Sequence, residues 1–369
     1  MASATTHARR SAVEAGAQPP SRWLFSAPVD LAAFLGSAVL SLVLLAIGGW
    51  YGWLWQRTPE WTWITAVLLL DVAHVYATAF RVYFVPRELL RRPGLYLLTP
   101  LLAFVIGAAL YSESEQLFWR VLAYLAVFHF VRQQYGWVAL YRRRAGEHDR
   151  LGAWIDGGAI YLATLYPLLY WHAHLPRNFA WFLSGDFVAL PALLAQIAWP
   201  LYLLALAAYA VKSAYRGFVV GQWNPGKDVV VVTTALCWYI GIVAINSDYA
   251  FTVTNVVIHG VPYMVLVYWV NIRTSDHAHH DEVPRPRLSW GWRKAIGFLA
   301  TLWLLAYVEE LLWDRSVWQE RPWLFGGGDY STHSSWLAPL LAVPQITHYI
   351  LDGFIWRRRS NPDLASREG

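Results

Sequence analysis

Four histidines lie inside segments of the chain that are otherwise apolar: His74, His129, His259 and His348. A polar side chain in hydrocarbon costs several kcal/mol unless it has a partner, so an ionisable residue in a membrane segment indicates a functional site. Neutral imidazole is also a frequent metal ligand. Because all four lie at a similar depth, we expect them to form one metal site in the inner half of a membrane.

Each of these histidines has a polar companion about one helical turn away, on its own helical face. The companions are Asp71, Gln133, Asn255 and Asp352. A metal-bound imidazole usually donates its second N–H to a carboxylate or a carbonyl. Asp71 and Asp352 are therefore expected to orient the imidazoles or to be ligands themselves, and Gln133 and Asn255 to be further ligands or hydrogen-bonding partners.

Two other side chains near the predicted site could take part in chemistry. Arg132 lies deep in an apolar segment and needs an anionic partner, which Asp71, Asp352 or a substrate carboxylate could supply. Tyr263 lies four residues after His259 and could donate a hydrogen bond or relay a proton and an electron.

A second histidine cluster occurs in the segment SDHAHHDE and contains His277, His279 and His280 beside Asp281 and Glu282. Such a density of imidazole and carboxylate can bind a divalent metal. The same composition is also typical of a solvated polar loop, and the sequence leaves both interpretations open.

The apolar segments that must position these residues indicate an integral membrane protein. The chain of 369 residues is 57% hydrophobic and only 14% charged, whereas about 25% charge is usual in soluble domains. Its longest apolar runs can cross a hydrocarbon core of about 30 Å. We predict an all-α, polytopic bundle of about ten spans, at 31–51, 63–84, 95–112, 117–140, 154–172, 190–211, 228–246, 249–272, 295–313 and 336–356.

The remaining segments are short. Residues 1–25 are predicted to be a disordered polar tail, 26–359 a single transmembrane domain, and 360–369 a short cytoplasmic tail. The lone cysteine, Cys237, lies in an apolar run and cannot form a disulfide within the chain.

The arginines and lysines predict the orientation. Every second connection between predicted helices is basic, as at 142–150 and 212–227, and the connections between them carry few basic residues. The positive-inside rule then places both termini in the cytoplasm, and we expect a bacterial inner-membrane protein. The net charge of +5 could suggest nucleic-acid binding. Because the basic residues lie at helix ends, we instead expect the lipid bilayer as the partner and no nucleic acid.

Imidazole ligands with carboxylates and little sulfur suit iron, zinc or copper. A redox metal held in this way, with iron the first expectation, could activate oxygen against a C–H or C=C bond. A site between membrane helices would meet a hydrophobic small molecule, such as a lipid or isoprenoid chain, directly from the bilayer.

The four histidines on separate helices, with their polar companions, resemble the multi-histidine integral membrane oxygenases, hydroxylases and desaturases. In placing single histidines on separate membrane helices, they most resemble the Brp/Blh-type carotene dioxygenases. The resemblance implies a membrane-bound, metal-dependent oxidoreductase acting on a lipid or isoprenoid, with an electron donor protein as a partner. The chain departs from the HxxxH and HxxHH boxes of desaturases, since it has only HAHH at 277–280. We therefore do not assign the substrate of either family to this chain.

Three other functions remain open from the sequence. Histidine pairs from four helices could hold haem in an electron-transfer or haem-modifying protein. The polar residues could instead serve a proton-coupled transporter. Finally, His259 or His348 could act as the general base of a membrane acyltransferase.

Overall fold

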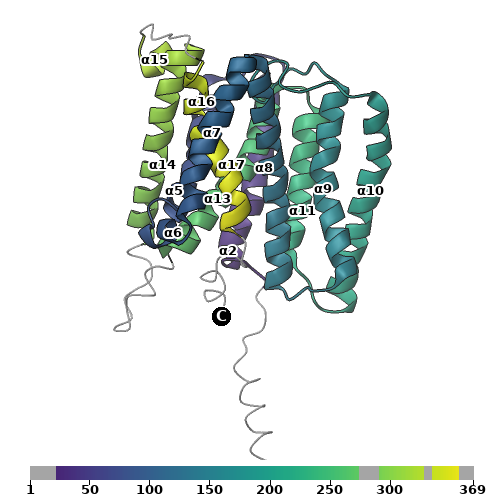
Figure 1. The fold of residues 1–369 in the computed structure, drawn as a ribbon. Helices are drawn as coiled ribbons and strands as arrows, with labels where there is room; N and C mark the ends of the chain where they lie inside the picture. The colour runs from purple at the N-terminus through teal and green to yellow at the C-terminus, as the bar shows by residue number, and fades with distance from the viewer. Residues whose placement is uncertain (1–21, 274–290, 328–334, 357–369) are drawn as a thin grey trace, which may run out of the picture.

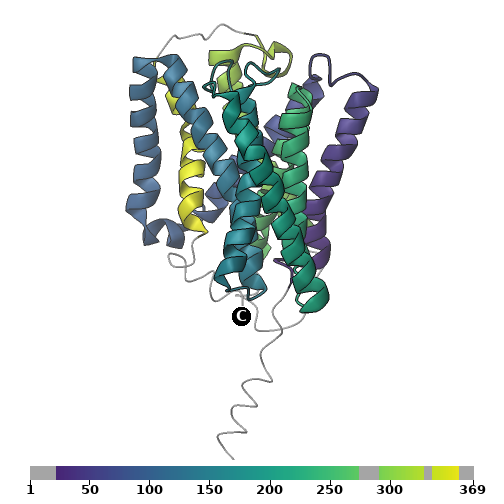
Figure 2. The ribbon, with the colours of Figure 1, turned by 90° about the vertical axis from the view of Figure 1, so that its right-hand side faces the viewer.

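The computed structural model describes residues 22–273, 291–327 and 335–356. The protein is all-α: 81% of it is helical, and no strand occurs in the described ranges. Long helices run side by side along one direction and form a bundle (Figures 1 and 2). The cluster at His277, His279 and His280, the tail at 360–369 and most of the predicted N-terminal tail lie outside the described residues.

The chain crosses the bundle repeatedly, and several crossings combine α-helical with π-helical turns, which are labelled η. In the first half these are α2 (Ala27–Asp30), η1 (Leu31–Gly36) and α3 (Ser37–Trp50); α4 (Glu60–Thr62), η2 (Trp63–Val72) and α5 (Ala73–Arg81); α6 (Pro86–Arg91) and α7 (Pro93–Glu113); α8 (Glu115–Arg144); and α9 (Arg150–Ala173). In the second half they are α10 (Ala192–Ala214) and η3 (Tyr215–Val219); α11 (Pro225–Trp238) and η4 (Tyr239–Ala244); α12 (Asp248–Phe251), η5 (Thr252–Val256), α13 (Val257–Val267) and η6 (Tyr268–Arg273); α14 (Gly291–Trp313), η8 (Asp314–Trp318) and α15 (Pro322–Phe325); and α16 (Leu337–Leu341) and α17 (Val343–Ile355).

Seven of these helical segments are long and apolar enough to cross a membrane. They are Ala27–Trp50, Glu60–Arg81, Pro93–Glu113, Ala192–Val219, Pro225–Ala244, Asp248–Asn271 and Gly291–Trp318. The other three predicted spans fall on α8, α9 and the α16–α17 pair, which are helical but are not among the seven. The apolar segments thus support a multi-pass membrane protein.

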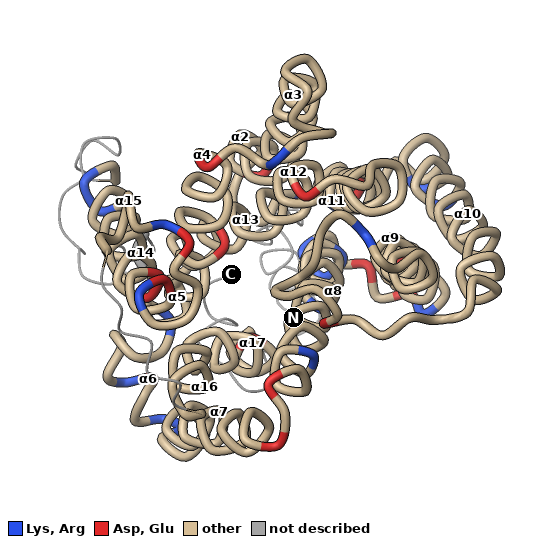
Figure 3. The backbone as a smooth tube through the Cα atoms, turned by 90° about the horizontal axis from the view of Figure 1, so that it is seen from above, with Lys and Arg blue, Asp and Glu red and all other residues tan. Residues whose placement is uncertain are grey.

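The start of α2 and the end of α17 lie at the same end of the bundle, which we call the terminal end (Figure 1). The opposite end, which we call the far end, carries the connections 51–59, 174–191 and 245–247. Figure 3 views the bundle from the far end.

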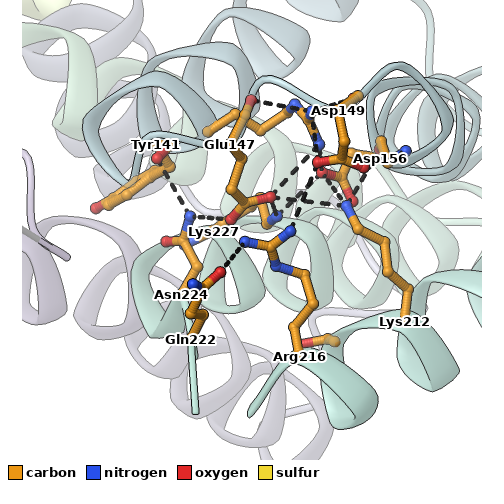
Figure 4. A network of polar contacts seen from close by, with 12 residues as sticks. Tyr141, Glu147, Asp149, Asp156, Lys212, Arg216, Gln222, Asn224 and Lys227 are labelled. Carbon is orange, nitrogen blue, oxygen red and sulfur yellow. Dashed lines mark hydrogen bonds and ion pairs between the residues drawn. The ribbon is translucent and has the colours of Figure 1, made fainter. Parts of the chain in front are cut away.

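A buried ionic network joins four helices at the terminal end (Figure 4). Lys227 of α11 donates to Glu147 at 2.5 Å and to Asp156 of α9 at 3.0 Å. Lys212 of α10 donates to Asp156 at 2.7 Å, and Arg142 of α8 contacts both carboxylates. Burial alone would raise the pKa of Glu147, but Lys227 and its hydrogen bonds hold that pKa below its usual value. The network fixes the ends of α8–α11 relative to one another.

The segment Asp248–Asn271 is the most deeply buried of the seven apolar helices. Its part α13 packs against α3, α5, α8 and η2, so it lies at the centre of the bundle. Gly260 permits this packing, since a Cβ atom there would lie only 3.1 Å from the backbone oxygen of Leu70. The close contact brings the helices that carry His74 and His259 together.

Candidate metal centre

The bundle brings the four predicted histidines together from four helices. They are almost completely buried, with exposed fractions of 1% for His74, 3% for His129, 0% for His259 and 1% for His348. The Nε2 atoms of His74 and His259 lie 3.1 Å apart, and those of His129 and His348 lie 3.2 Å apart. Ligand nitrogens of His74, His129 and His348 all lie within 4.8 Å of one another, so this triad could hold a metal ion.

The spacing of these nitrogens fits a metal ion. Imidazole–metal bonds of about 2.0–2.1 Å in a tetrahedral site separate neighbouring ligand nitrogens by about 3.3–3.4 Å. The observed Nε2 pairs at 3.1 and 3.2 Å are close to this separation. His259 is not part of the triad, but its Nε2 atom lies beside that of His74, where it could become a further ligand.

In three of the histidines, the ring nitrogen that faces away from the centre, Nδ1, has a polar contact. His74 Nδ1 lies 3.3 Å from the carbonyl oxygen of Leu70 and 3.7 Å from Asp71 Oδ1. His129 Nδ1 lies 3.7 Å from Asp352 Oδ2. Since these contacts favour the proton on Nδ1, they leave the Nε2 lone pairs free to face the centre. Asp71 and Asp352 thus lie behind the imidazoles, where they can orient them.

The third contact comes from Thr78, whose Oγ1 lies 2.7 Å from His348 Nδ1 and 3.3 Å from the hydroxyl of Tyr263. The helical spacing places Thr78 on the same face as His74, but nothing in the sequence indicates its partner on α17. Tyr263 is buried beside His348, with ring centroids 5.1 Å apart, and also interacts electrostatically with Asp352. Tyr263 therefore connects two groups that contact the histidines.

His259 differs from the other three because its Nδ1 atom is buried and has no hydrogen-bond partner in the described part of the chain. Its ring is instead covered by Phe130, which stacks on it with centroids 3.5 Å apart. Its carbonyl oxygen accepts a hydrogen bond of 2.9 Å from Gln133. Gln133 therefore positions the backbone of α13.

Two other predicted site residues point elsewhere. Arg132 is exposed, donates to Tyr161 and lies over the ring of Tyr135. Residues three apart on a helix differ by about 60° in direction, which is enough to turn Arg132 outward while His129 faces inward. Asn255 hydrogen-bonds Phe251 and Thr254 within its own helix. It lies in π-helical η5, where the four-residue spacing of an α-helix does not apply.

A cavity of about 1030 Å³ adjoins the centre. Asp71, Phe130 and Gln345 line it, and the first two contact His74 and His259 respectively. The far-end connections at 54–59, 178–183 and 246–247 also line it, so the cavity extends from the centre toward the far end. This route differs from the expected approach of substrate directly from the bilayer.

Sequence reasoning missed the carboxylates of α14. Glu309 and Glu310 are buried, with exposed fractions of 4% and 8%, and Glu310 lines the cavity. Glu309 accepts hydrogen bonds from Trp313 at 3.2 Å and from Gln345 at 3.4 Å. Two adjacent glutamates in the apolar run 295–313 are the signal that could have revealed them.

No family model, curated protein or solved structure is significantly similar to this chain, so the candidate site rests on its own geometry.

Proposed function

We propose that the protein is a multi-pass membrane enzyme, a metal-dependent oxidoreductase that acts on a lipid-like or isoprenoid substrate. The observation that carries the proposal is the convergence of four buried histidines from four helices, three of which, His74, His129 and His348, bring their ligand nitrogens within 4.8 Å of one another and have polar contacts on Nδ1. Ten spans, with both termini in the cytoplasm of a bacterial inner membrane, complete the proposal.

The donor set favours a redox metal, with iron first. His74, His129, His348 and His259 would hold the ion, which would supply the redox chemistry. Imidazole nitrogen with carboxylates nearby and no thiolate suits iron, and also zinc and copper. Tyr349 stacks on His129 with ring centroids 4.9 Å apart and offers a group that can donate an electron or a proton near the ion.

The distances favour a bare ion over haem, the main alternative. Two axial imidazoles on opposite sides of a haem iron would have their nitrogens about 4.1 Å apart, given metal–nitrogen bonds of about 2.0–2.1 Å. The Nε2 pairs at 3.1 and 3.2 Å are closer than this. The rings of His74 and His348 also lie edge to face with centroids 4.9 Å apart, which leaves no space for a macrocycle between them.

Metal analysis of the purified protein tests the site. We expect the wild-type protein to contain bound metal and to show no haem Soret band. The His74→Ala and His348→Ala variants should each contain at least about tenfold less metal than wild type, because each substitution removes a ligand. Elemental mass spectrometry gives the metal content per chain, and size-exclusion chromatography checks folding.

His172→Ala is the matched control. His172 is also a buried histidine, but it contacts Tyr124 and the carbonyl of Leu168, away from the centre. The metal content of the His172→Ala variant should therefore match that of wild type. Metal-free wild type would contradict the site, and a Soret band would favour haem. Oxygen consumption by the iron-loaded protein with lipid-like substrates tests the redox role separately. A metal-loaded protein that never consumes oxygen, but carries out proton-coupled transport or acyl transfer, would replace the oxidoreductase with one of those functions.

A further inference from the structure

The cavity beside the metal centre combines aromatic walls with an excess of carboxylates. Its aromatic residues include Trp63, Trp119, Phe130, Trp181, Phe251 and Trp313. Five carboxylates and two guanidinium groups line it, which leaves a formal charge of −3 when all are ionised. A cavity of this charge favours a positively charged occupant.

The charges in the outer part of the cavity are largely satisfied by one another. Arg321 donates to Glu60 at 3.2 Å and to Glu320 at 3.1 Å. Asp248 accepts a hydrogen bond of 2.8 Å from Thr58. These contacts account for three of the five carboxylates.

The two remaining carboxylates have no such partners. Glu310 has an exposed fraction of 8%; Arg321 attracts it electrostatically, but no hydrogen bond or ion pair joins Glu310 to another residue in the described ranges. Asp71 Oδ1 is buried without a hydrogen-bond partner, and its nearest basic group is the imidazole of His74. A buried carboxyl group without a charged partner either takes up a proton or is held ionised by a bound cation. The Asp71 side chain is 34% exposed, so it is accessible from the cavity, and a cation bound there would supply the partner that these carboxylates lack.

The lining indicates what kind of cation the cavity accepts. Faces of tryptophan and phenylalanine attract organic cations, and aromatic cages recognise quaternary ammonium groups in particular. An inorganic metal ion would require several ligands close together, and in the described residues only the histidine group meets that condition. The volume of about 1030 Å³ is also that of a site for a larger organic ligand.

We propose that this cavity binds an amphipathic organic cation, an alkylated amine or quaternary ammonium compound. Its charged group lies at Asp71 and Glu310, and its apolar chain lies along the tryptophan walls. Binding itself does not require a metal. That the cation is a substrate rests on the proposed function, because Asp71 brings the bound molecule next to His74.

The test measures binding of decyltrimethylammonium to the full-length protein in a non-ionic maltoside detergent, by isothermal calorimetry and tryptophan fluorescence. Decyl sulfate and decanol are the anionic and neutral comparison probes. We expect saturable binding of the cation alone. Glu310→Gln should raise its Kd about tenfold or more, because it removes a charged partner without changing the volume. Glu310→Asp, which keeps the charge, should bind more tightly than Glu310→Gln.

Glu113→Gln is the matched control, since Glu113 is an exposed glutamate at the end of α7 and does not line the cavity. Unchanged affinity in Glu310→Gln, or equal affinity for decanol, would overturn the proposal. The proposal would also be overturned if Glu310→Gln changed the pH dependence of cation binding but left the Kd unchanged, because Glu310 would then only exchange protons. His348→Ala separates the two proposals: cation binding that persists after metal is lost belongs to the cavity alone. Metal without cation binding would contradict only the cavity proposal.

Discussion

At the scale of single residues, the contacts behind the imidazoles decide which nitrogen atoms face the centre. The Nδ1 atom of His74 contacts the carbonyl oxygen of Leu70, which can only accept, so the Nε2 atom of His74 is available as a ligand, and Thr78 holds the His348 ring at its Nδ1 atom. Without those contacts, either ring nitrogen could carry the proton. A hydroxyl or carbonyl that never touches the metal can therefore determine how tightly it is bound.

Thr78→Val tests this at the shortest of the contacts. Valine keeps the shape of the side chain but cannot hydrogen-bond His348, so we expect metal affinity to fall about 10–100-fold. Competition with a chelator measures the change. Thr99→Val is the control, because among the described residues Thr99 donates its hydrogen bond to the carbonyl of Leu95 within its own helix. Equal affinities of the two variants would show that the Thr78 contact does not orient His348.

At the scale of helices, the site depends on how closely α13 approaches η2. Two π-helical segments end just before a site histidine: η2 ends before His74, and η5 ends before His259. A π-helical turn changes the direction of the side chains that follow it, so it helps to determine where each imidazole points. Gly260 then allows α13 and η2 to pack closely enough for the imidazoles of His74 and His259 to meet.

Gly260→Ala is expected to separate these helices. Its Cβ atom would lie 3.1 Å from the backbone oxygen of Leu70, so the backbone must shift. We expect the free energy of unfolding to fall by about 1–3 kcal/mol, as for other overpacked sites, and metal affinity to fall with it. Thermal melting in detergent and metal content measure the two effects.

The control for this change is Gly158→Ala on α9, where an added Cβ atom meets nothing within 4 Å. That variant should melt at or above the wild-type temperature, because alanine favours a helix more than glycine does. If Gly260→Ala melts and binds metal like Gly158→Ala, close helix packing is not what brings His74 and His259 together.

At the scale of the whole molecule, the two ends of the bundle differ. The terminal end carries Lys212, Lys227 and the arginines at 142–144, and the cavity extends toward the far end. If the positive-inside rule holds, the terminal end faces the cytoplasm and the cavity opens toward the opposite side.

Cysteine labelling tests this orientation. Cys237 is completely buried, so the native chain should not react with a membrane-impermeant maleimide. Trp55→Cys, at an exposed far-end position, should react in intact cells. His148→Cys, at an exposed terminal-end position, should react only after the membrane is permeabilised. The opposite pattern would reverse the proposed orientation.

The sequence by itself determined what depends on neighbours along the chain. Hydropathy located the apolar helices, and helical spacing placed Asp71 and Thr78 on the face of His74, because side chains one turn apart share a direction. Only the tertiary structure decided which faces meet. Thr78 contacts His348, which is 270 residues away, and Glu310 lines the same cavity as Asp71. It also turned Arg132 outward and Asn255 toward its own helix. These outcomes follow from helix rotation, π-helical turns and packing at Gly260, which the local spacing of residues does not specify.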